Sequence, residues 1–172
     1  MWRRGGLVLG LMLALAGCAG SEPQPQPVTV APPRDIQGEM RRAVAVIDDQ
    51  VRFADNGVYN RFSWMTDGSF CYLVQSKLEI RRSCFQPDQV DAGSVAARGA
   101  GGLGAPYDRV GVVCRRAGCM RTSSQLTSMF GPRGYRYENA LSMPTRRGGG
   151  ATTAHMLRRL LALAAQAGPP AL

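Results

Sequence analysis

The sequence has few of the residues on which most enzymatic chemistry depends. It contains one histidine, His155, so a Ser-His-Asp or Cys-His site would have to use that residue. No Gly-x-Ser-x-Gly nucleophile elbow accompanies it, and the glycine-rich run 99–104 lacks the Lys and Ser/Thr of a phosphate loop. We therefore expect no catalytic residue and no cofactor, and we interpret His155 as a surface residue of a helix.

Lysine is also scarce, since 20 of the 21 basic residues are arginine and only Lys77 is lysine. The 12 acidic residues leave a formal net charge of +9. Such a balance favours an anionic neighbour, for example lipid headgroups or a cell-wall polymer. The arginines are scattered along the chain, however, and the accompanying glycine and alanine are typical of a GC-rich coding bias. We interpret the arginines as a solvated surface rather than a dedicated anion site.

The first apolar run is too short to cross a bilayer, which takes about 20 residues. It extends from Leu7 to Ala16, follows Arg3-Arg4 and precedes a group of small residues. A charged start, a short apolar core and small residues are typical of a secretory signal peptide. A twin-arginine signal is the alternative, but the residues around Arg3-Arg4 match that motif poorly.

The small residues end in a cysteine, in the order Leu15-Ala16-Gly17-Cys18. This motif resembles the lipobox of bacterial lipoproteins, and the resemblance covers residues 1–19. It implies removal of residues 1–17, diacylglycerol on Cys18 and a further acyl chain, such as palmitate, on the new amine. Two or three acyl chains anchor a protein stably to a membrane, whereas one chain does not.

Residue 19 is alanine, whereas an aspartate after the cysteine resembles an inner-membrane retention signal. In a cell with two membranes, the resemblance thus implies the outer membrane, on the side that faces the periplasm. Export also separates the chain from nucleic acid, which we do not expect as a partner. The expected partners are the membrane, through the lipid anchor, and an envelope protein or an acidic wall or lipid component.

Composition divides the rest of the chain into three parts. Five prolines fall between residues 19 and 34, and this density excludes a helix or an interior strand. Residues 18–34 are therefore predicted to be a lipidated, polyproline-like tether. Residues 35–168 are long enough for a single domain with its own core, and residues 169–172 form a tail.

Amphipathic helices are predicted at both ends of this domain. Asp35 is a suitable N-cap for the first helix, and Asn56-Gly57 is its predicted stop. The second helix is predicted from about Thr152 to Ala167, with Gly168 after its last turn. The apolar residues at helical spacing are Ile36, Met40, Val44, Ile47, Val51 and Ala54 in the first helix and Leu157, Leu160, Leu161 and Ala164 in the second.

Between the helices, short alternating patterns predict five or six strands. Asp67-Gly68 is a hairpin signal, residues 92–106 are predicted to be a mobile Gly/Ala loop, and the last strand is predicted from Tyr135 to Met143. Because the strands do not alternate with helices, we expect an α+β fold with one antiparallel sheet, curved or partly closed, capped by the last helix. This order is similar in layout to pleckstrin-homology-like barrels.

Four cysteines remain beside Cys18, and in an oxidising compartment they allow two disulfides in three connectivities. Cys114 and Cys119 flank a short hairpin loop, while Cys71 and Cys84 lie symmetrically about another predicted hairpin. Facing residues of antiparallel strands are close enough for a disulfide, so we predict the pairs 71–84 and 114–119. The Cys-x4-Cys spacing is a poor zinc signature, and we expect no metal site.

Three functions remain open. A non-catalytic binding or assembly module of the cell envelope is favoured because the catalytic signatures are absent. A carrier of a lipid or anionic ligand inside the sheet is the first alternative, and a large apolar cavity would favour it. A small carboxylate-dependent hydrolase of an envelope polymer is the second alternative.

Two sets of side chains bear on these alternatives. The carboxylates that a hydrolase would use are expected to be solvated, and the aromatic residues that could stack on a sugar or a partner are expected in the core or on a sheet face. The carboxylates are Asp48, Asp49, Asp88 and Asp91, and the aromatic residues are Trp64, Tyr72, Tyr107, Tyr135 and Tyr137.

Overall fold

The computed structural model describes residues 35–52, 58–99, 107–126 and 134–168. Within these ranges the helices are α1 (Ile36–Val51) and α2 (Gly150–Ala167), and a short 3-10 helix, η1, covers Pro87–Gln89. The strands are β1 (Tyr59–Trp64), β2 (Phe70–Gln75), β3 (Glu79–Phe85), β4 (Val90–Arg98), β5 (Tyr107–Cys114), β6 (Met120–Leu126), β7 (Gly134–Glu138) and β8 (Ala140–Arg146). The predicted signal peptide, Cys18, the tether and the tail lie outside the described residues.

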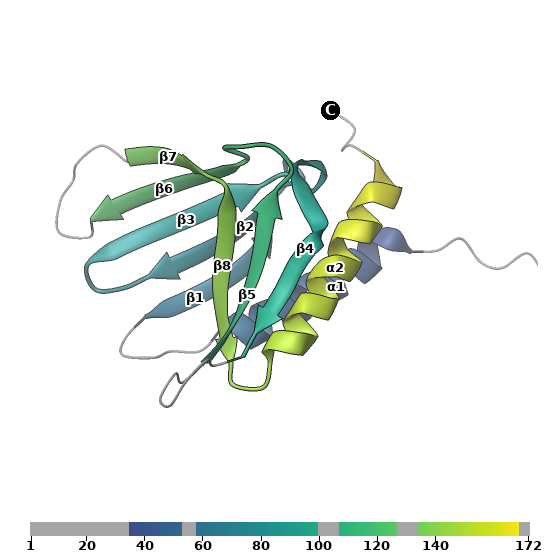
Figure 1. Cartoon of the computed structure of the whole chain (residues 1–172), viewed down its shortest axis with the longest axis horizontal. Coiled ribbons are helices and arrows are strands. Elements are labelled where there is room, and N and C mark those ends of the chain that lie inside the picture. Colours follow the sequence, from purple (N-terminus) through teal and green to yellow (C-terminus); the bar gives the residue numbers. More distant parts are fainter. Residues whose placement is uncertain (1–34, 53–57, 100–106, 127–133, 169–172) are drawn as a thin grey trace, which may run out of the picture. The chain divides into compact units, whose positions relative to one another are not determined.

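The described strands form two antiparallel sheets. Their order is β1-β2-β3-β6-β7 in one sheet and β4-β5-β8 in the other. Figure 1 shows the smaller sheet crossing the larger one, with β8 passing in front of it. The predicted α+β class is confirmed, but the described strands number eight in two sheets rather than five or six in one.

The two helices cover the opening between the sheets. Strands β1 and β4 are edge strands of different sheets. Helix α1 contacts β1 and α2, and α2 in turn contacts β4 and β5, so the helix pair lies between the two edges (Figure 1). The last helix is a cap, as the sequence predicts, but it acts together with α1.

The core fills the space between the sheets and the helix pair. Phe62, Phe70 and Phe85 come from β1–β3 and are fully buried, and the ring centroid of Phe70 lies 6.1 Å from that of Phe62 and 6.0 Å from that of Phe85. Burial of one large apolar side chain contributes about 1.5–3 kcal/mol. The helices add their predicted apolar faces to this core, including Met40, Ile47, Val51, Leu157, Leu160, Leu161 and Ala164.

Helix α1 begins where the sequence predicts. The Asp35 carboxylate accepts a hydrogen bond from the Gly38 N–H at 2.8 Å, which satisfies a free donor of the first helical turn. A Cβ at Gly38 would lie 2.0 Å from Asp35 Oδ2, so this cap depends on the absence of a side chain there. The helix ends at Val51, before the predicted Asn56-Gly57 stop, and Ala54 lies outside the described residues.

Strand β4 occupies much of the segment predicted to be a mobile loop. It pairs with β5, and the register shifts between Asp91 and Ala96. Because of this irregularity, Val90 and Val95 are both buried although they are five residues apart, and the alternation of a regular strand is lost. The loop prediction is therefore wrong for residues 92–98, and residues 100–106 lie outside the described residues.

The strand predicted from Tyr135 to Met143 is two strands that belong to different sheets. The chain leaves β7 in the larger sheet and enters β8 in the smaller sheet at Asn139. The Asn139 carbonyl accepts a hydrogen bond from the Cys114 N–H at 2.8 Å, and its side-chain oxygen accepts one from the Gly118 N–H at 2.7 Å. The β5–β6 and β7–β8 crossings therefore meet at one corner.

Both predicted pairs of cysteines are bonded in the structure. Cys71 and Cys84 occupy the same register position of β2 and β3, and their Cα atoms lie 4.1 Å apart. Cys114 and Cys119 close the loop between β5 and β6, with their Cα atoms 5.6 Å apart. One disulfide thus joins neighbouring strands of a sheet, and the other closes a crossing between sheets.

Candidate functional site

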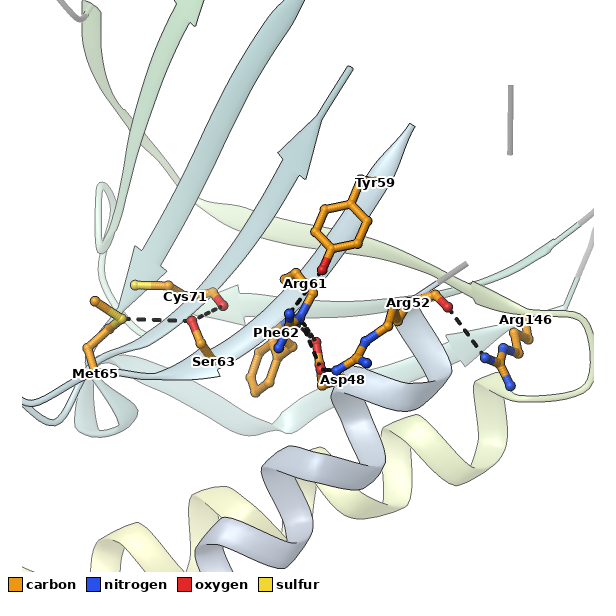
Figure 2. A network of polar contacts seen from close by, with 9 residues as sticks. All are labelled: Asp48, Arg52, Tyr59, Arg61, Phe62, Ser63, Met65, Cys71 and Arg146. Atoms are coloured by element: carbon orange, nitrogen blue, oxygen red, sulfur yellow. Dashed lines mark hydrogen bonds and ion pairs between the residues drawn. The ribbon is translucent and has the colours of Figure 1, made fainter. Parts of the chain in front are cut away.

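Asp48 on α1 stands at the centre of the polar network in Figure 2. Its carboxylate accepts hydrogen bonds from the Phe62 backbone N–H at 2.8 Å and from Arg61 Nε at 2.9 Å, and it forms an ion pair with Arg52. Only 5% of Asp48 is exposed. The prediction of a solvated position on the helix is therefore wrong, because β1 covers this side chain and supplies its partners.

The contacts of Asp48 indicate a structural role. Burial acts to raise its pKa, but the hydrogen bonds from Phe62, Arg52 and Arg61 outweigh burial and lower the pKa below its ordinary value. A carboxylate that stays ionised and has occupied oxygens is a poor general acid. Asp48 instead links α1 to β1 through its contacts with Arg61 and the Phe62 N–H. Strand β1 is an edge strand, and such strands present backbone donors that no neighbouring strand accepts.

The other residues considered for catalysis are not assembled into a site. Asp49 is exposed on α1, Asp88 is exposed in η1, and Asp91 accepts a hydrogen bond from the Gly93 N–H at 2.9 Å. His155 is exposed in the first turns of α2, as predicted. Within the described residues, no hydrogen bond or ion pair joins any two of the four candidate aspartates.

A different group of side chains gathers on the outer face of β3, β6 and β7. Tyr135 and Tyr137 of β7 are 55% and 70% exposed. In register, Tyr137 lies opposite Arg121 of β6, Tyr135 lies opposite Ser123, and Ser123 lies opposite Arg82 of β3. Residues paired in this way share one face of a sheet. We call this group (Arg82, Arg121, Ser123, Tyr135 and Tyr137) the tyrosine face.

The arginines of the tyrosine face have no carboxylate partners among the described residues. The Arg121 guanidinium carbon lies 4.7 Å from the centroid of the Tyr135 ring, which is a cation–π distance. In the part of the chain that the structure describes, neither Arg82 nor Arg121 forms an ion pair. Tyrosine and arginine are enriched at protein interfaces and among their hot-spot residues. The face therefore combines aromatic contact area with uncompensated positive charge.

The remaining aromatic candidates lie elsewhere. Tyr72 is buried, and its hydroxyl donates a hydrogen bond to Asn60 Oδ1 at 2.8 Å. Trp64 and Tyr107 are partly buried. The prediction that aromatic residues on strands lie in the core or on a sheet face thus holds for Tyr72, which is in the core, and for Tyr135 and Tyr137, which lie on an exposed sheet face.

A pocket of about 260 Å³ lies where Tyr72, Arg81 and Ser83 of the larger sheet meet Arg109 and Ser142 of the smaller one. Its lining is largely polar, whereas carriers of apolar ligands have pockets lined mainly by hydrophobic side chains. Its volume is below the roughly 300–1,000 Å³ of pockets for drug-sized ligands. These properties favour a small polar ligand over an acyl chain.

Two kinds of feature are absent from the described residues. No helix there combines the length and apolar character needed to cross a membrane. No group of three or more His, Cys, Asp or Glu side chains there could hold a metal ion.

Comparison of the chain with protein-family models, with curated proteins and with solved structures gave no match.

Proposed function

We propose that the protein is a membrane-anchored envelope lipoprotein that acts as a non-catalytic binding or assembly module, and that its partner binds to the tyrosine face. The observation that carries the proposal is the exposure of Tyr135 and Tyr137 beside arginines that lack ion pairs. A sheet face with these side chains resembles the core of a protein interface more than an ordinary solvated surface.

The partner that fits this face is a protein with an acidic patch around an apolar centre. Arg82 and Arg121 would meet the carboxylates, while the two tyrosine rings supply contact area. Charge of this kind accelerates encounter and selects the partner more than it raises affinity. The lipid anchor implied by the Cys18 motif would hold the domain at the membrane, and the proline-rich tether would let it reach a partner away from the bilayer.

The hydrolase alternative receives less support. Asp48 is occupied by the Phe62 N–H and by two arginines, and the described pocket contains none of the four candidate aspartates. The lipid-carrier alternative is weakened by the size and polar lining of that pocket.

The anchor can be tested with Cys18→Ser in the producing bacterium. We expect this change to abolish palmitate labelling and to move the protein from the membrane fraction to the soluble fraction, because the acyl chains that hold it are gone. Membrane fractionation and intact-mass analysis measure the result. A parent protein without lipid would contradict the lipobox interpretation.

The partner surface can be tested with a photo-crosslinking amino acid at position 137 in intact cells. We expect one dominant adduct, and we expect the Tyr135→Ala/Tyr137→Ala variant to reduce the affinity of the identified complex at least about tenfold, because a hot-spot residue contributes about 2 kcal/mol or more. The free energy of unfolding should change by less than about 0.5 kcal/mol per exposed substitution.

The matched control places the same amino acid at Val113, an exposed position on β5 in the other sheet. An equal yield of the same adduct from position 113 would show that the tyrosine face is not the interface. Turnover of a wall or lipid substrate that is lost on changing His155, or any of the four candidate aspartates, to alanine would show that the protein is an enzyme.

A further inference from the structure

The pocket between the sheets contains charge that the proposed partner surface does not use. Arg81 precedes Arg82 on β3, and side chains alternate along a strand, so the two arginines lie on opposite faces of the sheet. Arg82 belongs to the tyrosine face, whereas Arg81 lines the pocket, and Arg109 of β5 lines it from the other sheet. The pocket therefore brings together two arginines from different sheets.

Neither pocket arginine has a carboxylate partner in the part of the chain that the structure describes. Among the described residues, the ion pairs involve neither Arg81 nor Arg109. Arg109 Nη2 donates a long hydrogen bond of 3.4 Å to the Tyr107 hydroxyl, and its guanidinium carbon lies 5.3 Å from the centroid of that ring. These contacts position Arg109 without neutralising it.

Glu138 also lines the pocket, but its charge is already compensated. Its carboxylate forms an ion pair with Arg136 Nε at 2.9 Å and accepts a hydrogen bond from the Thr122 hydroxyl at 3.0 Å. The Thr122 proton is thereby used, so Ser83, whose hydroxyl oxygen lies 3.0 Å from that of Thr122, is the donor in their hydrogen bond. These hydrogen bonds, from Ser83 to Thr122 and from Thr122 to Glu138, hold one side of the pocket in place. The charges of Arg81 and Arg109 are then the two uncompensated positive charges in the pocket.

The buried Tyr72 hydroxyl lies within the field of both guanidinium groups. Burial raises the pKa of Tyr72, and the positive charges of Arg81 and Arg109 act in the opposite direction. The net pKa is raised, so Tyr72 remains neutral and adds no negative charge to the pocket.

We propose that this pocket binds the phosphate monoester group of a small polar ligand. A phosphate monoester carries a charge of about −1.5 to −2 at neutral pH, which matches two guanidinium groups, whereas a carboxylate matches one. Arginine binds phosphate through paired hydrogen bonds. The volume of about 260 Å³ admits a headgroup-sized ligand, and this inference is independent of the tyrosine face.

The phosphate group has two possible sources, and both present the same chemistry. It belongs either to a soluble ester, such as glycerol phosphate, or to a lipid headgroup that carries a phosphate monoester. The test uses the mature chain from residue 18 with Cys18→Ser, which retains the whole domain without acyl chains. Isothermal titration measures glycerol phosphate, inorganic phosphate and glycerate, and a flotation assay measures vesicles that contain phosphatidic acid or phosphatidylglycerol.

The variants are Arg81→Gln, Arg109→Gln and Arg82→Gln. Arg82 is the control because it adjoins Arg81 on β3 but lies on the opposite, exposed face. We expect glycerol phosphate to bind, Arg81→Gln and Arg109→Gln each to weaken it about tenfold or more, and Arg82→Gln to change it less than about twofold. Binding should weaken between pH 7.5 and 5.5, since the second pKa of a phosphate monoester is about 6. Flotation that requires Arg81 and occurs with phosphatidic acid but not with phosphatidylglycerol would show that the phosphate belongs to a lipid headgroup. If the protein binds glycerol phosphate but does not float with phosphatidic acid, the ligand is the soluble ester.

Three results would overturn the proposal. The first is an equal loss of affinity in Arg82→Gln and Arg81→Gln, which would indicate only general surface charge. The second is binding of glycerate as tight as that of glycerol phosphate. The third is an absence of phosphate binding in a protein whose denaturant midpoint shows that it is folded. None of these results bears on cross-linking from position 137, so the proposed function is tested separately.

Discussion

Asp48→Ala is expected to lower the free energy of unfolding by about 3 kcal/mol, near the lower end of the cost of breaking a buried ion pair. The substitution removes the acceptor of the Phe62 N–H and leaves Arg61 without its carboxylate. Arg52 and Arg61 are about half exposed, at 51% and 41% of their side chains, so water replaces part of the loss. Urea unfolding followed by circular dichroism measures the change.

The control is Asp49→Ala, at the next residue of the same helix. Asp49 is exposed, and its 3.6 Å ion pair with Arg146 lies at the surface, so we expect a change within about 0.5 kcal/mol. Similar losses for the two variants would show that Asp48 does not fasten α1 to β1.

The same carboxylate should make stability depend on pH. Because folding lowers the pKa of Asp48, its contribution is fully present above the pKa of the unfolded chain, near 4. The contribution is lost as the pH falls through the lower pKa of the folded protein. The stability difference between the wild type and Asp48→Asn should therefore be constant above about pH 5 and should shrink as the pH falls below the pKa of the unfolded chain, near 4.

Removal of the Cys71–Cys84 disulfide is the other change with a large expected effect. The two cysteines are 13 residues apart, and the loss of this loop constraint on the unfolded chain corresponds to about 3 kcal/mol. The Cys71→Ala/Cys84→Ala variant should show this loss in urea unfolding. Peptide mapping without reductant should also find Cys71 linked to Cys84 in the wild type.

The second disulfide provides the comparison. Cys114 and Cys119 are five residues apart, so their removal should cost only about 2 kcal/mol by the same argument. A peptide that links Cys84 to Cys114 would contradict both assignments. A larger loss for the Cys114–Cys119 pair would show that the corner at Asn139, rather than the length of the closed loop, determines its contribution.

The sequence correctly predicts the helices and turns that are defined by residues close together in the chain. Asp35 caps α1, Asp67-Gly68 forms the first hairpin with Gly68 at φ +80°, and Leu157, Leu160 and Leu161 of α2 are buried as predicted. In each case the residues that define the element are close in sequence. The pairing of the cysteines follows from the same local symmetry.

The errors arise where distant residues decide the outcome. Asp48 has polar neighbours on its helix, and nothing local shows that Arg61 and Phe62 will cover it. In β4, the register shift places both Val90 and Val95 on the buried side, which the spacing of five residues hides in the sequence. Alternation likewise shows that Tyr135 and Tyr137 share a face, but it does not show which face is exposed.

The pocket and the tyrosine face are hidden in the sequence for a related reason. The pair Arg81-Arg82 reads as a solvated charge cluster, yet one member lines a pocket and the other lies on the opposite surface. Arg109 lines the same pocket only because the smaller sheet meets the larger one there. The break at Asn139, which separates β7 from β8, is the feature that creates this meeting of sheets. No glycine or proline marks it, and a single asparagine within an alternating pattern is a weak turn signal.

The two disulfides also have a consequence for how the chain matures. Each joins a cysteine to the next cysteine along the domain, since the order is Cys71, Cys84, Cys114 and Cys119. If the chain is exported as proposed, its N-terminal end crosses the membrane first. After Cys18, which the proposal assigns to lipidation, the four thiols emerge in this order, and each native partner is the next to emerge. Oxidation in order of emergence would then yield the native pairs directly, without an isomerase to reshuffle them.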